Sequence, residues 1–239
     1  KINIYYSVDE LSHYMYYLLK YIDNRLKKFK QINFKVISTE VLNKKSYREK
    51  NKFFNNLIWI DPKKKYNWND LNLETPDIFF QSGWSKKSFN HLSKLTKQKN
   101  KNSKIVLLSD NSYQRRRIKQ ILGRIYFKIF LKKKFDFVWV PGLSGKKLMM
   151  KFGFDKKNIF TKLYCSLSDI YKNKTKIKKR KKQFLFVGQF IKRKNVNKLI
   201  DSFKSLNLDE KEWKLLLVGR GDLDLKKNNT NNIEIINQL

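Results

Sequence analysis

The chain has 239 residues, of which 41% are hydrophobic and 15% aromatic, which is enough apolar material for one large domain or two smaller ones. Its 55 lysine and arginine residues outnumber 20 aspartate and glutamate residues and give a formal net charge of +35. The single cysteine, Cys165, excludes an internal disulfide, and the two histidines exclude a histidine-rich zinc site. No apolar run in the sequence approaches the roughly 20 residues that a membrane-spanning helix needs.

The positive charge can arise in two ways. The lysines are spread over the whole length, and the chain lacks alanine but is rich in Lys, Asn, Ile, Phe and Tyr, as AT-rich codon usage produces. We assign most of the excess charge to this bias. The remainder suggests an anionic partner, either nucleic acid or a membrane surface. We expect a cytoplasmic protein, with the inner face of the membrane as an alternative location, and we favour membrane contact over nucleic acid.

Strand-like and helix-like segments alternate through the first part of the chain. Apolar runs predict strands at 2–6, 34–37, 53–60, 77–80, 104–108 and 137–140. Helical spacing of apolar residues predicts helices at 8–29, 86–95, 113–131 and 144–152. Such alternation is typical of a mainly parallel, doubly wound α/β sheet, so residues 1–169 are predicted to form one domain.

A change of composition marks a predicted domain boundary. Residues 170–183 are strongly basic and lack apolar periodicity, which is typical of a solvated linker. A second α/β unit is predicted over 184–239, with strands at 184–187, 215–218 and 233–236 and a helix at 196–206. Because this unit has too few strands for a complete sheet, and the chain starts at Lys1 rather than Met, we expect a fragment.

The loop that follows the first strand of this second unit has the chemistry of an anion site. Gly188 ends the strand, and Lys192, Arg193 and Lys194 precede the predicted helix. The amides at the start of a helix and nearby cations converge on anions, so the loop predicts a phosphate site. The alternative is a basic turn that binds no ligand.

The larger pattern resembles a known family. A strand ending in Val187-Gly188, a loop ending in Lys194, an amphipathic helix and a second strand followed by Gly219-Arg220-Gly221 are similar to the nucleotide-sugar domain of GT-B glycosyltransferases of the family-4 type. The resemblance implies two Rossmann-like doubly wound domains, the second incomplete here. It also implies a hexosyltransferase-type enzyme that moves a sugar from a nucleoside-diphosphate sugar to a hydroxyl of a glycan or lipid-linked acceptor, with retention of configuration and without cofactor or metal ion.

The same resemblance implies which residues bind the donor. In the family an arginine follows the strand, and a lysine and a glycine come five residues later; the corresponding residues here are Gln189, Lys194 and Asn195. We expect the donor to contact Gly188, Gln189, Lys194, Gly219, Arg220 and Gly221, with Lys192 and Arg193 as phosphate support. The family's paired glutamates should lie beyond Leu239, so we expect the fragment alone to be inactive.

Two features of this region could have a structural role in the backbone instead of binding a ligand or metal ion. Gly219 and Gly221 could be required only because a tight turn needs glycine dihedral angles. Asp222 and Asp224 form an Asp-x-Asp pair that binds metal in other glycosyltransferases, but we favour a helix cap as the role of Asp222.

The first domain offers polar residues at its predicted strand ends, where parallel sheets bind ligands. They are Ser7, Ser82, Gly83, Trp84, Ser109, Asp110 and Asn111. Asp110 is predicted to accept the hydrogen bond of the acceptor hydroxyl. Its alternative role is to cap a helix beginning near Asn111.

Two alternative functions remain open. Tyr113 and the basic residues Arg115–Arg117 suggest a nucleic-acid-binding α/β protein. Loss of the diphosphate-binding pattern would instead give a non-catalytic GT-B relative.

Overall fold

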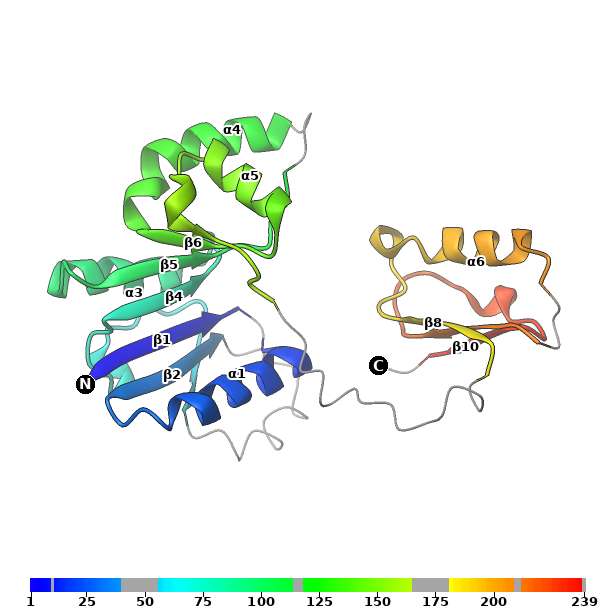
Figure 1. Cartoon of the computed structure of the whole chain (residues 1–239), viewed down its shortest axis with the longest axis horizontal. Coiled ribbons are helices and arrows are strands. Elements are labelled where there is room, and N and C mark those ends of the chain that lie inside the picture. The colour runs from blue at the N-terminus through cyan, green and yellow to red at the C-terminus, as the bar shows by residue number, and fades with distance from the viewer. Residues whose placement is uncertain (10, 40–55, 114–117, 165–180, 209–211, 238–239) are drawn as a thin grey trace. The chain divides into compact units, whose positions relative to one another are not determined.

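The computed structural model describes the chain except for residues 10, 40–55, 114–117, 165–180, 209–211 and 238–239 (Figure 1). The chain divides into two compact units, Lys1–Tyr171 and Lys172–Leu239. Cys165, Arg115–Arg117 and most of the expected linker lie outside the described residues.

The first unit is built on a parallel sheet of seven strands in the order β3-β2-β1-β4-β5-β6-β7. The strands are β1 (Ile2–Val8), β2 (Ile32–Thr39), β3 (Leu57–Ile60), β4 (Ile78–Ser82), β5 (Lys104–Leu108), β6 (Phe137–Trp139) and β7 (Ile159–Phe160). The predicted doubly wound fold is confirmed. The short edge strand β7 was not predicted, because two residues carry too little pattern.

Helices cover both faces of this sheet. They are α1 (His13–Leu26), α3 (Lys87–Lys99), α4 (Ile118–Tyr126), which runs on into a π-helical turn (Phe127–Leu131), and α5 (Leu143–Lys151). The helix predicted from residue 8 begins at His13 instead, because β1 extends to Val8. The helix predicted from Tyr113 is also shorter, since Tyr113 is not helical.

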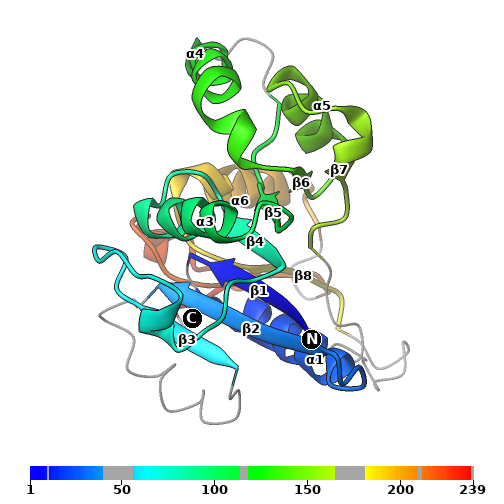
Figure 2. The same ribbon diagram turned by 90° about the vertical axis from the view of Figure 1, so that its left-hand side faces the viewer.

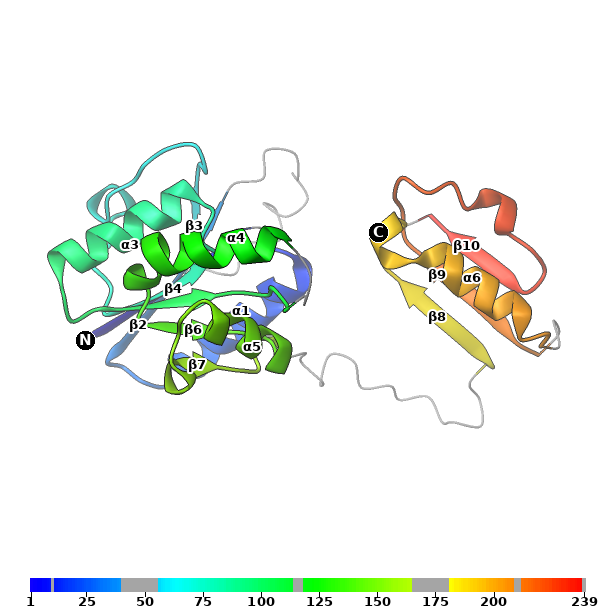
Figure 3. The same cartoon turned by 90° about the horizontal axis from the view of Figure 1, so that it is seen from above.

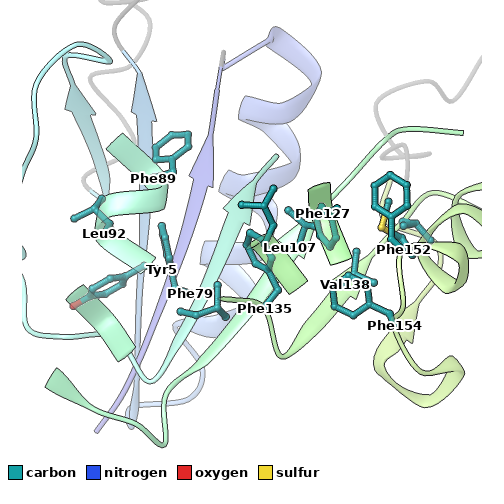
Figure 4. Close-up of a cluster of buried hydrophobic side chains, with 14 of the residues drawn as sticks. Tyr5, Phe79, Phe89, Leu92, Leu107, Phe127, Phe135, Val138, Phe152 and Phe154 are labelled. Atoms are coloured by element: carbon teal, nitrogen blue, oxygen red, sulfur yellow. The ribbon is translucent and has the colours of Figure 1, made fainter. Parts of the chain in front are cut away.

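Side chains alternate between the two faces of the sheet along each strand, and those on each face pack into a separate hydrophobic core. Tyr5 belongs to the core that contains residues of α3, the π-helical turn and α5, whereas its neighbour Tyr6 belongs to the core that contains residues of α1. Figure 2 shows α1 and α3 on opposite faces of the sheet. In the first core, Phe79 and Leu107 on the sheet lie against Phe89 and Phe127 on the helices (Figure 4). Burial of these large apolar side chains is the main force that holds the helices on the sheet.

The second unit has three parallel strands in the order β10-β9-β8 (Figure 3). They are β8 (Gln183–Val187), β9 (Lys214–Val218) and β10 (Ile233–Ile236). One helix, α6 (Val196–Ser205), buries Val196, Ile200 and Phe203 against this sheet. Single 3₁₀ turns occur at Lys192–Lys194 and Lys226–Asn228.

Among the described residues, no helix is both long and apolar enough to cross a membrane.

Candidate functional site

A pocket of about 390 Å³ opens at the carboxyl ends of β1, β4 and β5. From β1 the chain builds the sheet outward through β2 and β3, and it then resumes on the other side at β4. The pocket therefore lies at the topological switch point, where doubly wound sheets bind ligands. The structure brings all seven predicted strand-end residues to this pocket: Ser7, Ser82, Gly83, Trp84, Ser109, Asp110 and Asn111.

Hydrogen bonds hold the floor of this strand-end pocket. The completely buried Ser7 accepts a hydrogen bond at its Oγ from the Ser82 amide, at 2.8 Å. Gly83, at φ +62°, donates its amide to the carbonyl oxygen of Leu108 at 2.9 Å. The Ser109 amide donates to the carbonyl oxygen of Trp139 at 3.0 Å, so four neighbouring strand ends are tied together. A floor fixed in this way positions a ligand without rearrangement.

Asp110 lies at the edge of the pocket and is exposed to solvent. Residues 111–113 are not helical, so the alternative in which Asp110 caps a helix near Asn111 is wrong. The chain leaves β5 without regular secondary structure there, and the exposed Asp110 lines the pocket.

Sequence reasoning missed a charged pair in the same pocket. The Nζ atom of Lys86 lies 2.8 Å from Oδ1 of Asp9. Asp9 follows β1 directly and Lys86 precedes α3, so only the pairing of β1 with β4 makes them neighbours. The position of Asp9 after the first strand was the one signal available in the sequence. The pocket thus offers two carboxylates and one amine, which suit a ligand rich in hydroxyl groups.

The second unit presents two loops, which follow β8 and β9 and are joined backbone to backbone. The Phe190 amide donates to the carbonyl oxygen of Arg220 at 3.0 Å, and the Leu223 amide donates to that of Phe190, also at 3.0 Å. The Phe190 ring is 1% exposed and anchors the first loop in the core.

Gly219 and Gly221 are needed for close approach of the backbone rather than for unusual dihedral angles. A Cβ on Gly219 would lie 1.8 Å from the carbonyl oxygen of Gly188, and a Cβ on Gly221 would lie 2.4 Å from that of Phe190. Neither Gly219 nor Gly221 has a positive φ, so the tight-turn alternative is wrong.

Lys192, Arg193 and Lys194 form the exposed 3₁₀ turn directly ahead of α6. Asn195 ends that turn at φ +53° and ψ +35°, the left-handed conformation that glycine favours and asparagine tolerates better than most residues. Asn195 therefore has a backbone conformation that a glycine at this position would also allow. Gln189 and Arg220 are also exposed, and they complete the set of residues predicted to contact the donor.

The described residues contain no group of three or more His, Cys, Asp or Glu side chains that could hold a metal ion. Asp222 lies in a bend, and the next helical turn begins only at Lys226, so Asp222 is not the helix cap that the sequence suggested.

The comparison with protein families matches residues 168–239 to the family described as "Glycosyl transferases group 1". Residues 168–239 are therefore similar to the group 1 glycosyltransferases. The matched segment contains both loops and all the predicted donor-binding residues. A search of curated protein sequences gives no significant match.

Solved structures extend the likeness to the whole chain. A glycosyltransferase from Rickettsia africae matches with a TM-score of 0.64 and 14% identity, covering 100% of this chain and 69% of that one. An α-glucosyltransferase in complex with UDP and a DNA 13-mer containing an HMU base matches with a TM-score of 0.62 and 11% identity, covering 99% and 67%. A putative UDP-N-acetylglucosamine 2-epimerase from Listeria monocytogenes matches with a TM-score of 0.58 and 12% identity, covering 100% and 69%. At these identities the likeness shows the fold, which is GT-B.

Proposed function

We propose that this protein transfers a hexose from a nucleoside-diphosphate sugar to a hydroxyl group of a glycan or lipid-linked acceptor, with retention of configuration. The observation that carries the proposal is the group 1 match over the two interlocked loops of the second unit. The GT-B fold alone is shared with an epimerase, so the family match, rather than the fold, favours transfer.

The donor diphosphate is proposed to bind ahead of α6. Lys192, Arg193 and Lys194 give this turn three positive charges, and the free amides of the first helical turn add partial positive charge. Lys194, at the position of the family's lysine, stabilises the charge that grows on the leaving diphosphate. Gln189 replaces the family's arginine and supplies amide hydrogen bonds without charge, so neighbouring Lys192 and Arg193 take over the electrostatic part.

The acceptor is proposed to bind in the strand-end pocket of the first unit. Asp110 accepts a hydrogen bond from the reacting hydroxyl and orients it. Asp9 and Lys86 have lone pairs and protons left after their mutual contact, and these can hold further hydroxyls of the acceptor. No metal ion or cofactor takes part in this proposal.

One structural neighbour is bound to DNA, and this chain carries a formal charge of +35, so a nucleic-acid partner is the second candidate. The two candidates differ in their salt dependence. We expect UDP to raise the melting temperature of the chain at physiological salt, because diphosphate binding to a formed loop is only partly screened. Nucleic acid should bind at low salt and be released as the salt concentration rises.

The experiment is a thermal-shift titration with UDP alongside a salt series of duplex and single-stranded DNA binding. A higher melting temperature with UDP, together with release of DNA as the salt concentration rises, supports the transferase function. Tight DNA binding at physiological salt without any protection by UDP contradicts it.

A further inference from the structure

The first unit carries an apolar surface that its own cores do not use. Six side chains of α4 and the π-helical turn are between 44% and 64% exposed, and we call them the apolar stripe: Ile121, Leu122, Ile125, Tyr126, Ile129 and Phe130. Their spacing places them on one side of the helix, whereas Phe127 and Leu131 on the opposite side are buried in the core. Contiguous exposed apolar surface of this kind marks an interaction site.

Basic side chains lie beside the stripe. Lys104, Lys128, Lys132 and Lys133 line one shallow hollow next to the end of the π-helical turn, which we call the lysine hollow. The one carboxylate in it, Asp136, already contacts Lys97 at 2.8 Å. The hollow therefore keeps a net positive charge and suits an anionic group.

We propose that the apolar stripe and the lysine hollow together dock on the surface of an anionic lipid bilayer. The stripe enters the boundary between headgroups and acyl chains, and the lysine hollow contacts anionic headgroups. From Ile118 to Leu131 the helix has 14 residues, or about 21 Å at 1.5 Å per residue, which suits a helix lying along the surface rather than one crossing the bilayer.

This surface fits lipid better than the other anionic or apolar partners. Nucleic acid would pair with the lysines but would leave four aliphatic side chains of the stripe in water. A second copy of the chain would cover the stripe but would bring two lysine hollows and two large positive charges together. A bilayer with anionic headgroups satisfies both parts of the surface.

Docking there would place the bilayer next to the proposed acceptor pocket. A small cavity of about 130 Å³ under α4 is lined by Gly123 and Tyr126 and also by Trp84 and Asn111. Trp84 and Asn111 line the strand-end pocket as well, so the cavity under α4 adjoins the strand-end pocket. This step rests on the proposed function, and it selects a lipid-linked acceptor over a soluble glycan.

Flotation of the purified 239-residue chain with phosphatidylcholine vesicles, with and without phosphatidylglycerol, tests the docking surface. We expect flotation that depends on phosphatidylglycerol and weakens with salt. The Leu122→Glu/Ile125→Glu variant should lose flotation, because two charges would have to enter the acyl boundary. The matched control Phe29→Glu/Leu206→Glu makes the same charge change at residues that are 50% and 56% exposed elsewhere, and it should still float.

A second pair of variants tests the charge alone. Lys128→Gln/Lys133→Gln should weaken partitioning by about 25-fold, since each lysine near an anionic surface contributes roughly a factor of five. The control Lys63→Gln/Lys64→Gln removes two exposed lysines elsewhere. It should bind the vesicles better than Lys128→Gln/Lys133→Gln does. Equal losses in test and control variants, or no flotation of the unchanged chain, overturn the proposal.

Light scattering on the same samples tests whether a second copy of the chain, rather than a bilayer, covers the apolar stripe. A dimer that Leu122→Glu/Ile125→Glu converts to monomer, without any flotation, would assign the stripe to a second copy and overturn the membrane proposal. UDP binding is measured in parallel. Its retention with failed flotation contradicts only the docking surface, whereas flotation without UDP binding contradicts only the proposed function.

Discussion

The carbonyl oxygen of Gly188 occupies the space that a side chain at Gly219 would need, because a Cβ there would lie 1.8 Å from it. The loops after β8 and β9 are thereby pressed together, and the hydrogen bond between the Phe190 amide and the Arg220 carbonyl oxygen fixes their register. The residues proposed to bind the donor project from this double loop.

Gly219→Ala should therefore destabilise the second unit by about 1–3 kcal/mol, since the backbone has to move to admit one methyl group. Gly188→Ala is the matched control, because its new Cβ would meet only the Phe186 ring at 3.3 Å and the ring can shift. Denaturant unfolding followed by the fluorescence of Trp213 measures both. Equal stability of the two variants would show that the loops are less tightly joined than described.

Asn195 should behave as a substitute for glycine. Asn195→Gly is expected to leave the free energy of unfolding almost unchanged, whereas Asn195→Ala should cost about 1 kcal/mol, because alanine is disfavoured in the left-handed conformation at φ +53°. Asn197→Ala, at an exposed position inside α6, is the control and should be neutral or stabilising. A neutral Asn195→Ala variant would contradict the left-handed geometry.

Tyr5 should make the stability of the first unit depend on alkaline pH. Burial, with added repulsion from Glu74 and Asp77, raises the pKa of Tyr5 from 10.0 to about 12. The folded state therefore favours the neutral phenol, so this contribution is complete below pH 10 and is lost as the pH rises to about 12.

The hydroxyl of Tyr5 is buried and has no hydrogen-bond partner among the described residues. Tyr5→Phe should thus remove this alkaline loss and stabilise the chain by about 1 kcal/mol at neutral pH. Urea unfolding at several pH values measures both effects. A variant that is less stable at neutral pH would show that the hydroxyl does have a partner.

Asp110→Asn should lower kcat by about 10²-fold while leaving donor binding unchanged, because a neutral amide accepts a weaker hydrogen bond from the acceptor hydroxyl than a charged carboxylate does. Asp155→Asn changes an exposed carboxylate that makes no capping hydrogen bond and serves as control. The measurement is made with both variants in the complete protein, as transfer from a nucleotide sugar across a panel of hydroxyl acceptors. Similar rates for the two variants would remove Asp110 from the proposed mechanism.

The sequence predicted most of the sheet because parallel strands buried on both faces appear as uninterrupted apolar runs, such as Lys104–Leu108. The strand-end pocket followed from the same rule, since polar residues after parallel strands meet at one edge. The contact of Asp9 with Lys86 and that of Gly188 with Gly219 could not be predicted, because both depend on how separate loops approach each other.

The apolar stripe shows a different limit. The sequence predicted a helix at 113–131, but a helix that is apolar on two sides does not reveal which side is buried. Only the packing of Phe127 and Leu131 on the sheet shows that the other side is exposed.

Calorimetric titration of UDP into the chain and its Lys194→Ala variant tests the central claim most directly. Lys194 is exposed and precedes α6, so its replacement should leave the fold intact and remove charged hydrogen bonds to the diphosphate, which weakens UDP binding by about 10- to 100-fold. Lys198→Ala, an exposed position one turn further along α6, should bind UDP as the unchanged chain does. Equal UDP affinity in the Lys194→Ala variant and the unchanged chain would contradict the assignment of the donor site.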